Sequence, residues 1–273
     1  MNRKSGFYNG LTVPYGIWMA LFIVIPLGIV AGFAFTGADG HFSVENIKLL
    51  SRYTDTISRS VYFALIATLV SFIIAYPLAW ILSQTKIRTQ NILILLIMLP
   101  MWMNFILRTY SIMVLFEDTG IINNALVSMG LKPLKLINTG GAVIFGMVYN
   151  YLPFMILPLY STISKLDTQY IEAAKDLGAG WFQILKEVML PLTKPGIVSG
   201  ITMVFVPSVS TFYISQKLGG GRYTLIGDVI EMQFQTAYNY HLGASISLLL
   251  MILILLSLAI MNRAEGSEEG GES

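Results

Sequence analysis

The sequence contains no cysteine and only two histidines among its 273 residues. Without cysteine the chain has no disulfide, no thiolate nucleophile and no cysteine metal site. The two histidines, His41 and His241, lie far apart in the sequence. A zinc enzyme or a catalytic triad needs more ligands or bases than two isolated imidazoles. We therefore expect neither a metal site nor a catalytic residue in this chain.

Charged residues are also few. Lys, Arg, Asp and Glu together make up 12% of the residues, which is about half their share in an ordinary soluble domain. The net charge of +2 is too small to indicate nucleic-acid binding. Hydrophobic residues make up 55% of the chain and gather in long runs. These runs predict an all-α, polytopic membrane protein that is embedded in the lipid bilayer.

Six apolar runs are long enough to be transmembrane helices. Arg3 and Lys4 precede the first run, and no convincing cleavage site follows it, so we interpret it as an uncleaved span rather than a signal peptide. The six spans are expected at 14–35, 59–83, 91–116, 142–163, 195–215 and 243–261.

This pattern predicts three parts. Residues 1–58 hold the first span and an outer loop, in which Ser43 is placed to cap a short helix. Residues 59–262 form a five-helix transmembrane domain, and the acidic, Gly/Ser-rich tail 263–273 is expected to be disordered. Basic residues are denser in the short loops on one side, which places both termini and loop 167–191 in the cytoplasm.

Proline interrupts five of the six predicted spans. Each proline removes a helical hydrogen bond and permits a kink. Kinked spans suit a transporter that rocks between two states, although proline is also common in membrane helices in general. The prolines within the spans are Pro26, Pro77, Pro100, Pro153, Pro158 and Pro207.

One long polar stretch interrupts the apolar runs between the fourth and fifth spans. Asp167 is placed to cap a first short helix, and Gly178 to close it in the left-handed conformation. A second short helix follows and is expected to end at Pro191, because proline has no amide hydrogen to donate. Pro195 suits the first turn of the fifth span. Two amphipathic helices of this kind form either a docking knob or a mere connector between spans.

The residues of this stretch carry a resemblance. The triplet Glu172-Ala173-Ala174, then Gly178 and later Val188-Met189-Leu190-Pro191, resembles the EAA loop of the membrane subunits of binding-protein-dependent ABC importers. That family usually has Ile where Val188 stands. The blocks 100–110 and 152–167 are similar to those of the PotB-type permeases of spermidine/putrescine importers. The resemblance implies a permease with the type I ABC importer fold in the bacterial inner membrane, and the distribution of basic residues predicts N-in and C-in topology.

The resemblance also implies a division of labour. A second homologous permease subunit (PotC-type) completes the pathway, and a substrate-binding protein (PotD-type) delivers the substrate. Two copies of an ATPase subunit (PotA-type) bind the ATP and Mg. This chain would then be no enzyme and hold no cofactor, and its Gly219-Gly220-Gly221 indeed lacks the Lys-Ser/Thr of a P-loop.

Within that family the EAA loop supplies a coupling helix that docks in a groove of the ATPase. By resemblance, Glu172 would face a basic residue of the groove, and Leu177 and Val188 would pack within the loop itself. The residues that the resemblance assigns to coupling are Glu172, Ala173, Ala174, Asp176, Gly178, Leu190 and Pro191.

A polyamine is a flexible di- or trication, so its path needs carboxylates or aromatic faces. Asp228 and Glu231 would share one face if they lie on a helix. Arg108 is expected near the outer boundary, snorkelling to water or pairing with Glu117. Aromatic residues near span ends are also typical of interfacial belts. The candidates for the substrate path are Trp102, Asn104, Tyr110, Tyr149, Asn150, Tyr213, Asp228 and Glu231.

Three other functions stay open. A permease for another small solute would share this scaffold. An ion-driven carrier that works alone would need acidic residues within its spans and an inverted repeat. The predicted spans contain no acidic residue, and no internal repeat is evident, so the carrier is disfavoured. A non-transporting membrane scaffold would explain neither the proline-broken spans nor the EAA-like loop.

Overall fold

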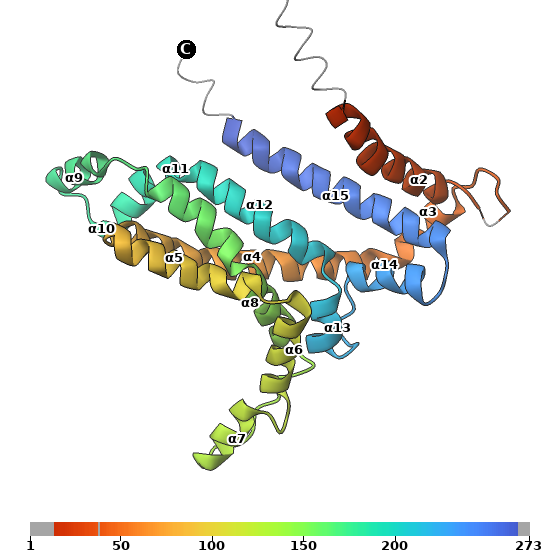
Figure 1. The fold of residues 1–273 in the computed structure, drawn as a ribbon, viewed down its shortest axis with the longest axis horizontal. Helices are drawn as coiled ribbons and strands as arrows, with labels where there is room; N and C mark the ends of the chain where they lie inside the picture. The colour runs from red at the N-terminus through yellow and green to blue at the C-terminus, as the bar shows by residue number, and fades with distance from the viewer. Residues whose placement is uncertain (1–13, 38, 267–273) are drawn as a thin grey trace, which may run out of the picture. The chain divides into compact units, whose positions relative to one another are not determined.

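The fold is described from a computed structural model of residues 14–37 and 39–266. These residues form helices joined by turns and loops, with one isolated antiparallel bridge between Thr36 and Phe42 and no strand. The expectation of an all-α chain is confirmed. Figure 1 shows the helices, which are η1 (Ala20–Val24), α2 (Ile25–Ala34), α3 (Glu45–Leu49), η2 (Leu50–Tyr53), α4 (Thr54–Ser83), α5 (Ile87–Trp102), α6 (Phe105–Phe116), α7 (Ile121–Ser128), α8 (Gly140–Ile163), α9 (Thr168–Asp176), α10 (Trp181–Gln183), η3 (Ile184–Met189), α11 (Leu190–Leu192), α12 (Lys194–Ser210), α13 (Tyr213–Gly219), α14 (Ile226–Gln235) and α15 (Tyr240–Gly266).

The chain divides into two compact units. The first unit comprises the residues up to 55 together with 229–253, and the second comprises 56–228 together with the residues from 254 onwards. The division cuts α14 and α15, so each of these helices contributes to both units.

In the first unit, the start of α15 holds the end of α2. The Ser245 hydroxyl donates a hydrogen bond to the Ala34 carbonyl at 3.0 Å, and the His241 ring contacts the Phe33 carbonyl at 3.2 Å. The short helix predicted in the outer loop is α3. Ser43 Oγ accepts a hydrogen bond from the Glu45 amide at 3.2 Å. The N-cap position of α3 is nevertheless Val44, one residue later than predicted, and it has no side-chain cap.

Four of the described helices are long and apolar enough to cross a membrane, and two bent helix pairs raise the number to six if each pair is one span. The prediction of six spans agrees with this count. The third span is more broken than predicted, because Ile87–Trp102 and Phe105–Ser128 meet at 91°. The break lies after Trp102 rather than at Pro100. Asn104 caps the helix that follows the break, α6.

The core of the second unit is the packing of α12 against α8, which lie side by side in Figure 1. Gly196 and Gly200 form a G-x-x-x-G pair on α12 that lets the two backbones approach. A Cβ at Gly196 would lie 2.9 Å from the Pro158 carbonyl oxygen, and one at Gly200 would lie 2.7 Å from Met155 Sδ. This pair is a packing signal that the sequence analysis missed.

Several boundaries differ from the predicted ones. The second and third spans begin earlier than expected, at Thr54 and Ile87. The fifth span ends at Ser210 rather than near Ser215, and α13 follows after a break. The predicted outer loop 216–242 is largely helical, since it contains α14, and loop 117–141 contains α7. The helix α15 runs to Gly266, so residues 263–266 of the predicted disordered tail are helical. Arg3, Lys4 and residues 267–273 lie outside the described residues.

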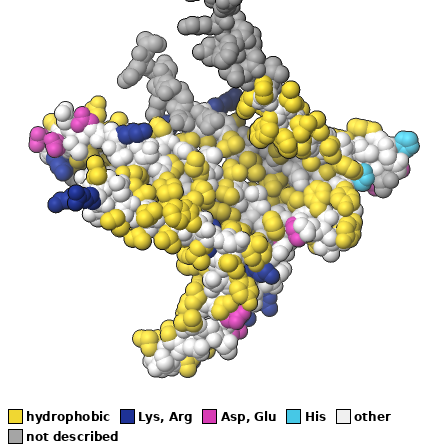
Figure 2. Space-filling view, viewed as in Figure 1, with side chains coloured by type: hydrophobic (Ala, Val, Ile, Leu, Met, Phe, Trp, Pro, Cys, Tyr) yellow, Lys and Arg dark blue, Asp and Glu magenta, His cyan; other side chains and the backbone are white. Residues whose placement is uncertain are grey.

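Hydrophobic side chains cover much of the second unit in Figure 2, while acidic and basic side chains gather around α9. This distribution is typical of helices that face lipid and of a loop that faces water. Figure 1 shows α9 protruding beyond the point where α4 ends and α5 begins.

Candidate functional site

The first helix of the EAA-like loop is closed at both ends by its own sequence. Asp167 Oδ1 accepts a hydrogen bond from the Gln169 amide at 3.0 Å, as expected for an N-cap. At the other end Gly178 has a φ of +84°, and the Ala179 amide donates to the Ala174 carbonyl at 3.0 Å. This is the Schellman motif, in which glycine tolerates the left-handed conformation. Both predicted caps are confirmed.

The second helix of the loop passes through Pro191 instead of ending there. It consists of α10, the π-helical turn η3 and α11, and it ends at Leu192. Pro191 falls in the first turn of α11, directly after η3, where a missing amide hydrogen is tolerated. The helix therefore ends one residue after the predicted end, and Pro191 does not terminate it. Ile184 and Met189 are buried and anchor this helix in the second unit.

The loop presents an apolar tip next to its carboxylates. Glu172, Ala173 and Asp176 are exposed. Leu177 is 89% exposed and Phe182 is 73% exposed. The expectation that Leu177 packs within the loop was wrong, because α9 ends at Asp176 and the turn at Gly178 leaves Leu177 outside the apolar stripe. Val188 is a packing residue, and it packs against the buried core cluster rather than only within the loop.

Two of the substrate-path candidates serve as helix caps. Asn104 Oδ1 accepts hydrogen bonds from the amides of Ile106 at 2.8 Å and Leu107 at 3.4 Å. Asp228 is buried near the start of α14, and its Oδ2 accepts a hydrogen bond from the Leu225 amide at 2.6 Å. Both residues thus satisfy amides that a helix start leaves without partners. Glu231 is half-buried on the same helix, so the predicted helical placement of this carboxylate pair holds.

The aromatic candidates lie on α5, α6, α8 and α13. Trp102, Tyr110 and Tyr149 are exposed, whereas Tyr213 is half-buried. The Tyr213 ring already holds a cation, since Lys217 Nζ lies 5.6 Å from its centroid. The ring of Phe105 lies 6.2 Å from the same tyrosine and connects α6 to α13.

A buried polar cluster lies where α6 meets α8. Asn150, 1% exposed, donates from Nδ2 to the Gly146 carbonyl at 2.9 Å and to Thr109 Oγ1 at 3.5 Å. Arg108 is 7% exposed, and its Nε and Nη1 have no hydrogen-bond partner among the described residues. The expectation of a snorkelling Arg108 was wrong, because it points into the protein.

Arg108 is a functional candidate that the sequence analysis discounted. A cation inside an otherwise apolar run is the signal that could have identified it, because burying an unpaired charge is costly. Arg108 acts electrostatically on Tyr151 of α8, whose side chain is hydrogen bonded to Thr211.

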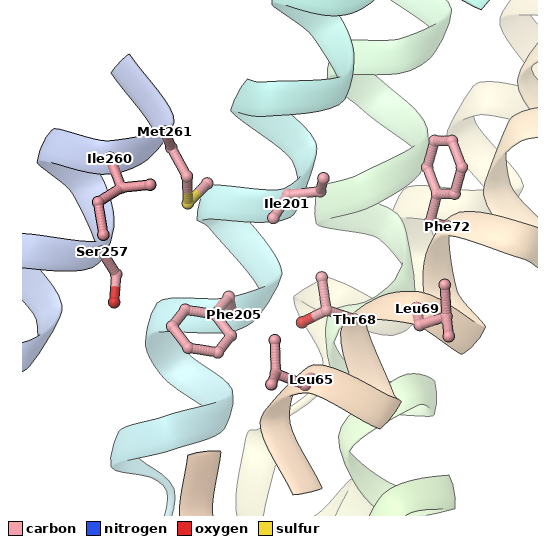
Figure 3. A pocket seen from close by; sticks show the side chains of 9 residues that line it. All are labelled: Leu65, Thr68, Leu69, Phe72, Ile201, Phe205, Ser257, Ile260 and Met261. Carbon is pink, nitrogen blue, oxygen red and sulfur yellow. The ribbon is translucent and has the colours of Figure 1, made fainter. Parts of the chain in front are cut away.

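The second unit also contains an apolar pocket of about 410 Å³ between α4, α12 and the last turns of α15. Figure 3 shows that Leu65, Phe72 and Phe205 line it and that Thr68 and Ser257 supply the hydroxyls in view. The Thr68 hydroxyl bonds to the Ala64 carbonyl of its own helix at 2.7 Å. Without a carboxylate the pocket offers nothing to neutralise a polyamine, and no substrate-path candidate lines it.

Comparison with known proteins places this architecture in one family. Residues 25–265 match the family described as binding-protein-dependent transport system inner membrane component. The chain is 38% identical over 257 residues to the spermidine/putrescine transport system permease protein PotB of Haemophilus influenzae, covering 90% of each chain. It is 36% identical over 257 residues to the protein of that name from Escherichia coli, covering 90% of this chain and 94% of the other.

Solved structures share the fold at low sequence identity. A chain of a bacterial ABC transporter involved in the import of the acidic polysaccharide alginate matches with a TM-score of 0.79 at 14% identity, covering 96% of both chains. A chain of the MetNI methionine ABC transporter in an inward-facing conformation matches with a TM-score of 0.55 at 20% identity, covering 82% of this chain and 97% of the other. The match to the family and the identity to its PotB members together show that this chain belongs to the inner membrane components of binding-protein-dependent transport systems.

Proposed function

We propose that this chain is the permease subunit of an ATP-driven importer for polyamines such as spermidine and putrescine. The observation that carries the proposal is the identity of 36–38% to PotB proteins over at least 90% of the chain. The alternative of a permease for another small solute has no comparable support, since the alginate and methionine transporters share only the fold.

The loop 167–191 is the part of the chain that would bind the ATPase and transmit its conformational change to the spans. Its α9 protrudes and is capped at both ends, by Asp167 and by the turn at Gly178. It exposes a carboxylate at Glu172 and an apolar tip at Leu177 and Phe182. A carboxylate beside large apolar side chains fits a groove with a basic rim and an apolar floor. ATP and Mg would be bound by two copies of that ATPase and not by this chain.

The remaining partners would be a homologous second permease and an extracytoplasmic binding protein. Both termini and loop 167–191 would lie in the cytoplasm, in agreement with the density of basic residues in the short loops. The path for a polyamine would run past the aromatic faces near the α5–α6 break and α13, where Tyr213 holds the ammonium of Lys217.

The test is ATP hydrolysis by this chain assembled with a companion permease and an ATPase subunit in liposomes. Binding protein loaded with spermidine should stimulate hydrolysis and drive uptake, and unloaded binding protein should not. Stimulation by another solute alone would keep the importer and remove the polyamine. If no ATPase subunit co-purifies with the chain, the importer is wrong and the solitary carrier becomes the better hypothesis.

A further inference from the structure

A hydrogen bond joins the residue that follows the second helix of the EAA-like loop to α4, a span that is far away in the sequence. The Tyr76 hydroxyl of α4 lies 3.0 Å from Thr193 Oγ1, at a sequence separation of 117 residues. Both residues are buried, and Thr193 is 0% exposed. Thr193 is the single residue between α11 and α12, where Trp181–Leu192 and Lys194–Ser210 meet at 75°. The bond therefore holds the corner at which the loop becomes a membrane span.

The direction of this bond follows from the other contacts of Thr193. Its hydroxyl donates to the Met189 carbonyl at 2.7 Å, with the Leu190 carbonyl at 3.4 Å. A threonine hydroxyl has one hydrogen to donate, so Tyr76 is the donor to Thr193 Oγ1. The resulting chain runs from the Tyr76 hydroxyl through Thr193 to Met189 in the π-helical turn η3. It ties α4 to the last residue of η3, a type of turn that is frequent at functional sites.

A second contact joins α4 to the start of the same loop helix. The rings of Trp80 on α4 and Trp181 at the start of α10 lie 5.8 Å apart at an interplanar angle of 52°. Between the two contacts a pocket of about 300 Å³ is lined by Tyr76, Trp80, Trp181, Leu185 and Met189, with Pro77 and Ile81. The pocket interrupts the packing of the loop helix on α4. Ile184 and Met189 of this helix still lie in one buried cluster with Leu82 of α4. The tryptophan pair and the hydrogen bond add two specific contacts to that packing.

We propose that Tyr76 and Trp80 are positioning residues that clamp the second helix of the EAA-like loop to α4 at two points, Trp181 at its start and Thr193 at the corner that follows it. A push on α9 then moves α4 together with α12, instead of moving α12 alone through the corner at Thr193. This proposal rests on the proposed function for its consequence in transport. The clamp itself can be measured without it.

The clamp is measured first on the full chain in lipid nanodiscs. Because the chain has no cysteine, Gln84→Cys directly after α4 and Gln169→Cys on α9 give two unique positions for spin labels. We expect Tyr76→Phe and Thr193→Val each to at least double the width of the label–label distance distribution. Tyr62→Phe, an exposed tyrosine on the same helix, is the matched control and should leave the width unchanged. Unchanged widths in both clamp variants would overturn the proposal.

Transport is measured next on the assembled complex in liposomes. In Tyr76→Phe and Thr193→Val we expect uptake per ATP hydrolysed to fall about fivefold, the range for one lost hydrogen bond. Hydrolysis should stay within about twofold of the unsubstituted complex. The double variant should be no worse than Thr193→Val alone, because Thr193→Val already removes the bond to Tyr76 together with the donation to the Met189 carbonyl. Additive losses would overturn the shared bond. A widened distribution in a complex that never responds to spermidine would support the clamp and reject the proposed function.

Discussion

The hydroxyl of Ser60 accepts a hydrogen bond from the Ile226 amide at 2.8 Å, although the two residues are 166 positions apart. Ile226 is the first residue of α14, and both residues are buried. A side chain of α4 therefore supplies the cap that the sequence just before α14 does not. The start of α14 is thus fixed by the tertiary fold of the second unit.

Replacing Ser60 with Ala should destabilise the protein by about 1–3 kcal/mol, because the buried Ile226 amide would lose its acceptor. The measurement is the thermal unfolding midpoint of the purified chain in detergent. Ser58→Ala is the matched control, since Ser58 is an exposed serine on the same helix. Equal midpoints for the two variants would show that a water molecule replaces the hydroxyl at no cost.

Asp228→Ala and Asp228→Asn separate a capping role from a charge role. The Asn side chain keeps an oxygen that can accept from the Leu225 amide, whereas Ala removes it. We expect Asp228→Ala to cost about 1 kcal/mol of stability and Asp228→Asn to cost much less. Uptake by Asp228→Asn, assayed in liposomes, should stay close to that of the unsubstituted complex. A tenfold loss of uptake at unchanged stability would instead show that the charge itself handles the polyamine.

Glu172→Lys should leave membrane insertion and folding intact, because Glu172 is exposed on α9. It should abolish assembly with the ATPase, since a like charge would then face the basic rim that we propose. Co-purification of the ATPase subunit is the measurement. Glu187→Lys, an exposed carboxylate on η3, serves as the control. Normal uptake by Glu172→Lys would rule out its coupling role.

Leu177→Ala tests the apolar tip. Because the side chain is 89% exposed, its removal should leave the stability of the chain unchanged. If the tip is buried against the ATPase, the loss should weaken their association by about tenfold or more, given about 1.5–3 kcal/mol for a buried leucine. Leu131→Ala removes another exposed leucine, outside the loop, as a control. Titration of the ATPase subunit against both variants measures the effect, and identical affinities would exclude the tip from the interface.

Gly196→Ala should disturb the packing of α12 on α8. The added Cβ would lie 2.9 Å from the Pro158 carbonyl oxygen, a backbone atom that cannot move aside alone. We expect a loss of about 1–3 kcal/mol from overpacking. Gly28→Ala on α2 is the control, because nothing lies within 4 Å of its added Cβ. The fraction of monodisperse protein after heating compares the two, and equal fractions would mean that the helices separate without cost.

The sequence predicted those parts of the fold that local chemistry decides. Asp167 and Gly178 cap α9 through contacts with residues only a few positions away in the sequence. Pro195 lies in the first turn of α12, as expected. The six-span pattern follows from the lengths of the apolar runs.

The wrong predictions concern features that depend on contacts between residues far apart in the sequence. The exposure of Leu177 depends on where the chain turns after α9, and the path through Pro191 depends on the burial of Ile184 and Met189 in the second unit. The clamp at Thr193 involves a tyrosine 117 positions away. Hydropathy likewise predicts 91–116 as one span. Met103 and Asn104 break the helix, but the apolar run continues on both sides of them, so hydropathy does not reveal the break.

The 91° break between α5 and α6 also sets the hydration of this protein. A helix that stops inside a bilayer leaves carbonyl groups at its end that lipid cannot satisfy. Asn104 satisfies two amides on the far side of the break, and Met103 donates to the Pro100 carbonyl at 3.2 Å. The other carbonyls of the last turn of α5 need water or a neighbouring subunit. Within a bilayer, either water molecules reach these carbonyl groups, or a neighbouring subunit of the assembled transporter covers them and excludes the water.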